Sequence, residues 1–153
     1  MDVSFILDDL NDEQRKAVTS ESKKLLVLAG AGSGKTKVLV HRIAWLIKAL
    51  GCSTHSVLAV TFTNKAASEM TGRIESILDQ PIPELWCGTF HSISNKILRR
   101  HYKEAGLERD FSILDSDDQL RIIKRVLKRL EIDDEQWPAE KVRWQINNWK
   151  DDG

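Results

Sequence analysis

Apolar and polar positions along the first part of the chain predict strands and helices in turn. Continuous apolar runs at 25–29, 57–62 and 85–88 are typical of strands that are buried on both faces. After each run, apolar residues recur at helical spacing, over 35–50, 64–78 and 90–103. Because a strand is followed by a helix three times, the pattern predicts an α/β fold with a parallel sheet and covering helices.

From residue 111 onward the pattern predicts only helices, over 115–130 and 139–150. Asp115 and Ser116, with Gln119 three residues after the serine, are suited to begin the first of these helices. Its apolar positions occupy one arc, and a basic face occupies the other. A solvated surface and a surface for duplex DNA are both compatible with such a face. The basic face consists of Arg121, Lys124, Arg125, Lys128 and Arg129.

Length and composition allow one ordinary domain, or one domain with part of a second, in 153 residues of which 41% are hydrophobic. The 23 basic and 23 acidic residues cancel, so net charge by itself predicts no attraction to nucleic acid or membranes. The longest uncharged run, 49–64, contains polar residues and does not resemble a membrane span. The beginning lacks the basic residues of a signal peptide. We therefore expect a cytoplasmic protein.

The most informative segment lies between the first predicted strand and the helix after it. Small residues there let backbone N–H groups turn toward phosphate oxygens, and the N-terminus of the helix adds partial positive charge. Lys35 is suited to contact the β- and γ-phosphates, and the Thr36 hydroxyl is suited to ligate Mg²⁺. The segment is a phosphate loop (Walker A motif) and predicts a nucleoside triphosphate site. Its residues are Ala29, Gly30, Ala31, Gly32, Ser33, Gly34, Lys35 and Thr36, with alanine where the motif begins with glycine.

Three further segments resemble the motifs of one enzyme family. Residues 10–15 resemble the Q motif of superfamily 1 DNA helicases, residues 59–67 resemble motif Ia, and residues 88–91 resemble motif Ib. In order and spacing, with the phosphate loop between the first two, they resemble the UvrD/Rep/PcrA branch. The resemblance implies the N-terminal part of a RecA-like ATP-binding domain, 1A, over 1–110, and the beginning of a helical subdomain, 1B, over 111–153. It also implies ATP-dependent 3′→5′ movement on single-stranded DNA, with Mg²⁺, in DNA repair.

The resemblance implies that two side chains contact the adenine of ATP. Gln14 would do so because a side-chain amide presents a donor and an acceptor together. A reciprocal helix cap with Asn11 is the alternative role for this glutamine. Lys37 stands where the family commonly has arginine, and lysine lacks the planar surface that stacks on a base. Contact between Lys37 and adenine is therefore left open.

Two sets of residues are implied to bind single-stranded DNA, and they follow the second and third predicted strands. The carboxyl ends of parallel strands meet at one edge of a sheet, where ligands bind. An aromatic ring there can stack on a base, while hydroxyls and helix-start N–H groups contact phosphates. Core packing of Phe62 and an ordinary helix start at the second set are the alternatives. The sets are Phe62, Thr63 and Asn64, and Thr89, Phe90 and His91.

A motor of this kind needs carboxylates that hold Mg²⁺ and orient the attacking water. Two Asp-Glu-Gln strings occur, at 12–14 and 134–136, and neither follows a predicted strand. Asp115, after the short apolar run 111–114, is the best local candidate, and a Mg²⁺-binding Asp115 would indicate a small phosphotransferase.

The family resemblance favours a different role for this chain. We expect an N-terminal fragment of a longer helicase that is inactive by itself. Its expected partners are single-stranded DNA, junctions of single and double strands, and repair proteins. A non-catalytic module that binds single-stranded DNA or a repair protein is the remaining alternative.

Overall fold

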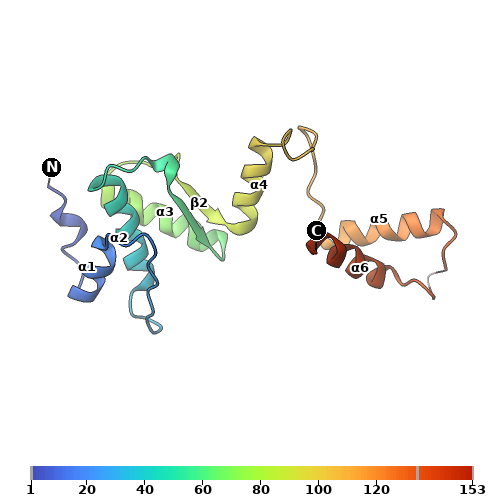
Figure 1. Cartoon of the computed structure of the whole chain (residues 1–153), viewed down its shortest axis with the longest axis horizontal. Helices are drawn as coiled ribbons and strands as arrows, with labels where there is room; N and C mark the ends of the chain where they lie inside the picture. The colour runs from blue at the N-terminus through green and yellow to red at the C-terminus, as the bar shows by residue number, and fades with distance from the viewer. Residues whose placement is uncertain (1, 134, 153) are drawn as a thin grey trace. The chain divides into compact units, whose positions relative to one another are not determined.

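The computed structural model of the protein describes residues 2–133 and 135–152. Three residues lie outside the described ones: Met1 of the implied domain 1A, Asp134 in the second Asp-Glu-Gln string, and Gly153, the last residue of the implied subdomain 1B. The chain forms two compact units, one up to Ala105 and one from Gly106 onward. Figure 1 shows the elements of both units along the chain.

The first unit is a mixed α/β structure whose sheet is parallel. β1 and β2 pair from Leu58 opposite Trp86 to Thr61 opposite Thr89. The three helices predicted for this part of the chain are present, which confirms its α/β character. Two short 3-10 helices are η1 (Ser4–Ile6) and η2 (Thr54–Ser56). The other elements are α1 (Asp12–Thr19), α2 (Lys35–Lys48), β1 (Leu58–Thr61), α3 (Asn64–Leu78), β2 (Trp86–Thr89) and α4 (Phe90–Arg100).

The first predicted strand is wrong. Residues 25–29 have no regular structure, and Figure 1 draws them within the loop between α1 and α2. Leu26 is 81% exposed and Leu28 is 84% exposed, so the run is not buried on both faces. An inner strand needs backbone hydrogen bonds from neighbouring strands. Within the described residues, the sheet pairs only β1 with β2, so the predicted full phosphate-loop sheet is not shown.

The core of the first unit forms where α2 and α3 meet the sheet. The buried residues of α3 are spaced three or four apart, as one helix face requires. The Thr63 side chain begins this helix by accepting a hydrogen bond from the N–H of Ala66, at 3.1 Å. The main buried cluster is Ile6, Val40, Ile43, Ala44, Ala59, Met70, Ile74, Leu78, Ile82 and Leu85.

The second unit consists of α5 (Ser116–Arg129) packed against α6 (Ala139–Asp151). The residues before α5 form no strand, and the Asp115 side chain caps the helix by accepting from the N–H groups of Asp117 and Asp118. On the apolar arc of α5, Leu127 is buried, whereas Val126 remains about half exposed. The predicted amphipathic helix is therefore present, but its apolar arc is only partly covered in this unit.

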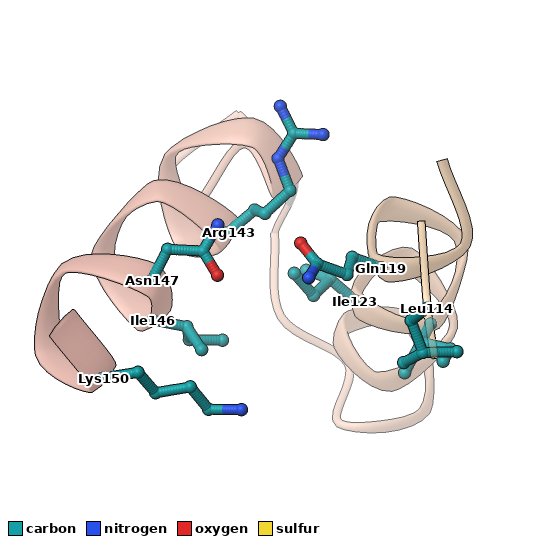
Figure 2. A pocket seen from close by; sticks show the side chains of 8 residues that line it. Leu114, Gln119, Ile123, Arg143, Ile146, Asn147 and Lys150 are labelled. Carbon is teal, nitrogen blue, oxygen red and sulfur yellow. The ribbon is translucent and has the colours of Figure 1, made fainter. Parts of the chain in front are cut away.

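A small cavity of about 190 Å³ lies between α5 and α6. Figure 2 shows the Gln119 and Ile123 side chains facing Asn147 and Ile146 across it. The Arg143 guanidinium donates to the Ser116 carbonyl, at 3.1 Å, and links the beginnings of the two helices. No residue predicted to bind nucleotide or DNA lines this cavity among the described ones.

The described helices are too short or too polar for a membrane. α3 has 15 residues, whereas a helix that crosses the hydrocarbon core needs about 20 apolar residues. No helix within residues 2–133 and 135–152 has the length and apolar character of a membrane span.

Ile74 provides a test of this core, because its side chain is 0% exposed. Ile74→Ala removes buried methyl groups and leaves a cavity, so we expect the free energy of unfolding of the first unit to fall by about 2–5 kcal/mol. Urea denaturation followed by circular dichroism measures the change. Ile97→Ala is the matched control, because Ile97 is 42% exposed in the same unit. Equal losses in the two variants would contradict this description of the core.

Candidate functional site

The phosphate loop leads directly into the N-terminus of α2. Gly32 and Gly34 have φ angles of 74° and 87°, in the left-handed region where a Cβ atom is unfavourable. Gly34 is the N-cap residue of α2 and makes no side-chain cap. The N–H groups of the first helical turn point out of the helix end and carry partial positive charge. The loop therefore has the backbone geometry of an anion site.

The two side chains of the loop that the sequence predicts to be functional, Lys35 and Thr36, lie at this helix end. The Lys35 ammonium donates to the carbonyl oxygens of Ala29 and Gly30, at 2.9 and 2.6 Å, and so lies over the loop. The Ser33 hydroxyl donates to the Gly30 carbonyl, at 2.7 Å, and tightens the turn. Thr36, the second residue of α2, is exposed. A cation and a hydroxyl are thus placed beside the anion site.

Gln14 connects α1 to the phosphate loop. Its side-chain oxygen accepts from the N–H of Asn11, at 3.2 Å, while the Asn11 side chain accepts from the N–H of Gln14, at 2.9 Å. Its side-chain NH₂ group also donates to the carbonyl oxygen of Ser33 in the loop, at 3.2 Å. The helix cap that the sequence offered as an alternative is therefore present, and the same amide also reaches the phosphate loop. Its contact with adenine stays a prediction.

Lys37 is bound to the protein's own backbone. Its ammonium donates to the carbonyl oxygen of Asp9, at 2.5 Å, across 28 positions of sequence. This hydrogen bond ties the first turn of α2 to the segment before α1. The sequence carried no signal for this contact, because it depends on the packing of α1 against α2. Contact between Lys37 and adenine stays open, as the sequence left it.

The two predicted DNA-binding sets lie at the carboxyl ends of β1 and β2. Thr61 is opposite Thr89 in the parallel ladder, so both strand-to-helix junctions share one edge of the sheet. Phe62 is 96% exposed and Phe90 is 70% exposed. The core-packing alternative for Phe62 is therefore wrong.

Each junction also begins a helix in an ordinary way. Thr63 caps α3, and Thr89 caps α4 by accepting from the N–H of Ser92, at 3.2 Å. Asn64 and His91, in the first turns of these helices, are exposed. The edge thus presents aromatic rings beside helix N-termini, which is the combination that stacks on bases and contacts phosphates.

The carboxylates that the sequence offered as metal ligands do not gather at the phosphate loop in the described residues. Within the described part of the chain, no three His, Cys, Asp or Glu residues gather as metal ligands would. Asp115, the candidate for a phosphotransferase, has one side-chain oxygen that accepts the N–H groups of Asp117 and Asp118, at 2.9 and 2.8 Å. It is a helix cap in the second unit. Thr36 is the one predicted metal ligand that lies at the phosphate loop.

Sequence reasoning missed one polar cavity in the first unit. It is lined by cationic side chains of α4, by Trp86 and by residues 55 and 84, none of which belongs to a motif. The only signal in the sequence was the run of basic residues near the end of the third predicted helix, which by itself is usual for a helix C-terminus.

Comparison with known proteins shows similarity to DNA helicases. Residues 10–153 match the model of the UvrD/REP helicase N-terminal domain. The whole chain is 54% identical to DNA helicase II of Escherichia coli (strain K12), and it covers 21% of that protein. Over 147 residues, or 96% of the chain, it is 44% identical to ATP-dependent DNA helicase PcrA of Bacillus subtilis (strain 168), and covers 20% of it. The chain thus spans about a fifth of the length of these curated relatives.

Gly34 tests the geometry of the phosphate loop. A Cβ atom at this position would lie 2.9 Å from the side-chain nitrogen of Gln14, on a backbone with a φ of 87°. We expect Gly34→Ala to lower the free energy of unfolding by about 1–2 kcal/mol, from the left-handed φ alone, and to weaken pyrophosphate binding. Urea denaturation and isothermal titration calorimetry measure the two effects. Gly72→Ala, in α3 and outside the phosphate loop, is the control, since a Cβ atom there meets nothing within 4 Å. If Gly34→Ala changed neither the free energy of unfolding nor pyrophosphate affinity, the result would contradict this loop geometry.

Proposed function

The chain belongs to the UvrD/Rep helicase family, as the sequence resemblance predicted, and from that premise we propose that it forms the N-terminal part of an ATP-dependent DNA helicase. In this proposal the phosphate loop binds ATP with Mg²⁺, and the shared edge of β1 and β2 binds single-stranded DNA. The observation that carries the proposal is the open N-terminus of α2, with Lys35 and Thr36 beside it and Gln14 bonded to the loop.

The nucleotide part of the proposal assigns one role to each side chain. Lys35 exchanges the two carbonyl oxygens that it now contacts for the β- and γ-phosphate oxygens of ATP. The N–H groups of the loop and of the α2 N-terminus hold the phosphates. Thr36 supplies a hydroxyl ligand to Mg²⁺, which neutralises phosphate charge when bound. Gln14 is hydrogen-bonded to the Ser33 carbonyl of the loop, and in this proposal it contacts the adenine of ATP.

The DNA part of the proposal rests on two exposed aromatic rings. Phe62 and Phe90 follow paired strands and are 96% and 70% exposed, so we expect their rings to be available to bases. When an exposed ring stacks on a base, apolar surface of both is removed from water, which stabilises the complex. The rings' neighbours in sequence at the two helix starts carry hydroxyl, amide, imidazole and backbone N–H groups that suit phosphates; they are Thr63, Asn64, Thr89 and His91.

The wider role follows from the family. We assign residues 1–110 to a RecA-like domain 1A and residues 111–153 to the beginning of a helical subdomain 1B. This division agrees with the boundary between the two compact units to within a few residues. Movement in the 3′→5′ direction, a role in DNA repair in the cytoplasm, and binding of strand junctions and repair proteins are parts of the same proposal.

ATP binding is tested at Lys35 and Thr36. Lys35→Ala removes charge-assisted hydrogen bonds to phosphate, so we expect ATP–Mg²⁺ affinity to fall by about 1.5–3 kcal/mol in calorimetric titration. Thr36→Ala should weaken binding only when Mg²⁺ is present, because its hydroxyl acts through the metal. Lys48→Ala, at the opposite end of α2, is the control for loss of a lysine. Unchanged affinity in Lys35→Ala would show that the loop does not bind the triphosphate.

DNA binding is tested by Phe62→Ala in a full-length helicase that carries this sequence. Loss of one base-stacking ring should weaken binding of a single-stranded oligonucleotide by about 1–3 kcal/mol, measured by fluorescence anisotropy. Phe5→Ala is the matched control, because Phe5 is a partly exposed ring in η1 and not at the sheet edge. If both variants bind DNA as the unmodified protein does, Phe62 does not contact the strand.

A further inference from the structure

A polar cavity lies at the amino end of β2, at the opposite end of the strand from the proposed DNA edge. It has a volume of about 430 Å³. Pockets of this size commonly hold small ligands or parts of larger ones. Residues from η2, from the segment before β2 and from the last turns of α4 converge on it. The lining residues are His55, Glu84, Trp86, Lys96, Arg99 and Arg100.

Two cations are held over one aromatic ring in this cavity. The Lys96 ammonium lies 4.9 Å from the centroid of the Trp86 ring, and the Arg100 guanidinium carbon lies 5.6 Å from it. Both contacts are within the range of a cation–π interaction. The two residues are four apart on α4, where like charges repel each other. The ring therefore fixes two mutually repelling cations side by side, both exposed to solvent.

The cavity has a net positive charge. Lys96, Arg99 and Arg100 contribute three permanent cations, whereas Glu84 is the only carboxylate among the lining residues. The Glu84 carboxylate is itself engaged, since it lies 2.7 Å from Nε2 of His55. The charge of the lining is thus +2 before any proton on His55 is counted.

The helix end explains only part of this arrangement. Basic residues are favoured in the last turn of a helix, and Arg99 and Arg100 occupy that turn of α4. Lys96 lies one turn earlier, where this effect is small. A favourable helix end also does not require Lys96 and Arg100 to lie over Trp86. These contacts direct both charges to one cavity.

We propose that this cavity binds a phosphate group of the nucleic-acid strand. A planar guanidinium pairs with two phosphate oxygens at once, and an ammonium adds a point charge. Lys96 and Arg100 both lie over the Trp86 ring, so a ligand that approaches the ring also meets two cations. Three cations against one carboxylate, which is itself paired with His55, favour a phosphate backbone over an apolar side chain of a protein partner.

The position of the cavity agrees with a strand that extends from the DNA edge. Trp86 and Thr89 are the first and last residues of β2, and three steps along a strand span about 10 Å. Along α4, the ten steps from Phe90 to Arg100 span about 15 Å. A strand bound at the edge would reach the cavity within a few nucleotides. The inference rests on the proposed function, because the strand is taken to be the DNA held at that edge.

The test compares charge variants of the full-length helicase that carries this sequence. Lys96→Gln with Arg100→Gln removes two cations from the cavity. We expect it to weaken binding of a 16-nucleotide single-stranded DNA several-fold and to lower the slope of log affinity against log salt by about 1–2. Glu84→Gln should strengthen binding, because it removes the only lining carboxylate. Lys16→Gln with Arg73→Gln is the control; it removes the same charge from α1 and α3, where each cation pairs with a glutamate.

Each outcome decides the inference. Opposite effects of the cation variant and Glu84→Gln, with the control unchanged, support a phosphate site. Equal losses of DNA affinity in the cation variant and the control would show that only net charge matters, and would overturn the inference. Binding of a polyglutamate peptide that needs Lys96 and Arg100, with DNA binding unaffected, would also overturn it, in favour of an acidic peptide.

Two further measurements keep the result interpretable. Circular dichroism melting checks the fold of each variant, and Glu84→Gln leaves the cations on Trp86 and so tests the site even if the cation variant unfolds. Phe62→Ala is measured in parallel. Loss of DNA binding in Phe62→Ala but not in the cation variant would reject the inference and leave the proposed function intact. Failure of the unmodified protein to bind DNA would reject the proposed function itself.

Discussion

The parallel pairing of β1 with β2 is the constraint on which two surfaces of the first unit depend, namely the proposed DNA edge and the cavity at Trp86. The ladder places Thr61 beside Thr89, so the two strand-to-helix junctions meet at one edge with Phe62 and Phe90 exposed. Because α4 turns back along β2, its last turns return to the amino end of the strand and put Lys96 and Arg100 over Trp86. One backbone pairing thus creates an aromatic edge at one end and a cationic cavity at the other.

The conformation of the phosphate loop depends much less on the pairing of the sheet. Its shape comes from left-handed glycines and from short-range hydrogen bonds of Ser33 and Lys35 to loop carbonyl groups. Its attachment to the rest of the unit comes from α1, through the contact of Gln14 with Ser33, and from Lys37, which bonds to the backbone before α1. The loop can therefore have the geometry of an anion site although the run before it, 25–29, is not paired as a strand.

The sequence predictions were accurate for features that depend on local interactions and inaccurate for features that depend on distant segments. The helix over 64–78 was predicted at both ends, because its Thr63 cap and its apolar spacing are local features. The run 25–29 was predicted as a strand and is not one, because an apolar run becomes a strand only when neighbours satisfy its backbone. The same limit applies to α5, where the apolar arc is visible in the sequence but the residues that would cover it are not.

The sequence by itself determined where the helices after residue 34 begin, which faces of them are apolar, and which residues match a phosphate loop, because these features depend on side chains within about one helical turn. It also determined the family, through motifs in a fixed order. Only the tertiary structure decided that Phe62 is exposed, that Lys37 bonds to Asp9, and that the α4 cations converge on Trp86. The physical reason is distance along the chain: these contacts join segments whose approach depends on strand register and helix packing, which no local pattern records.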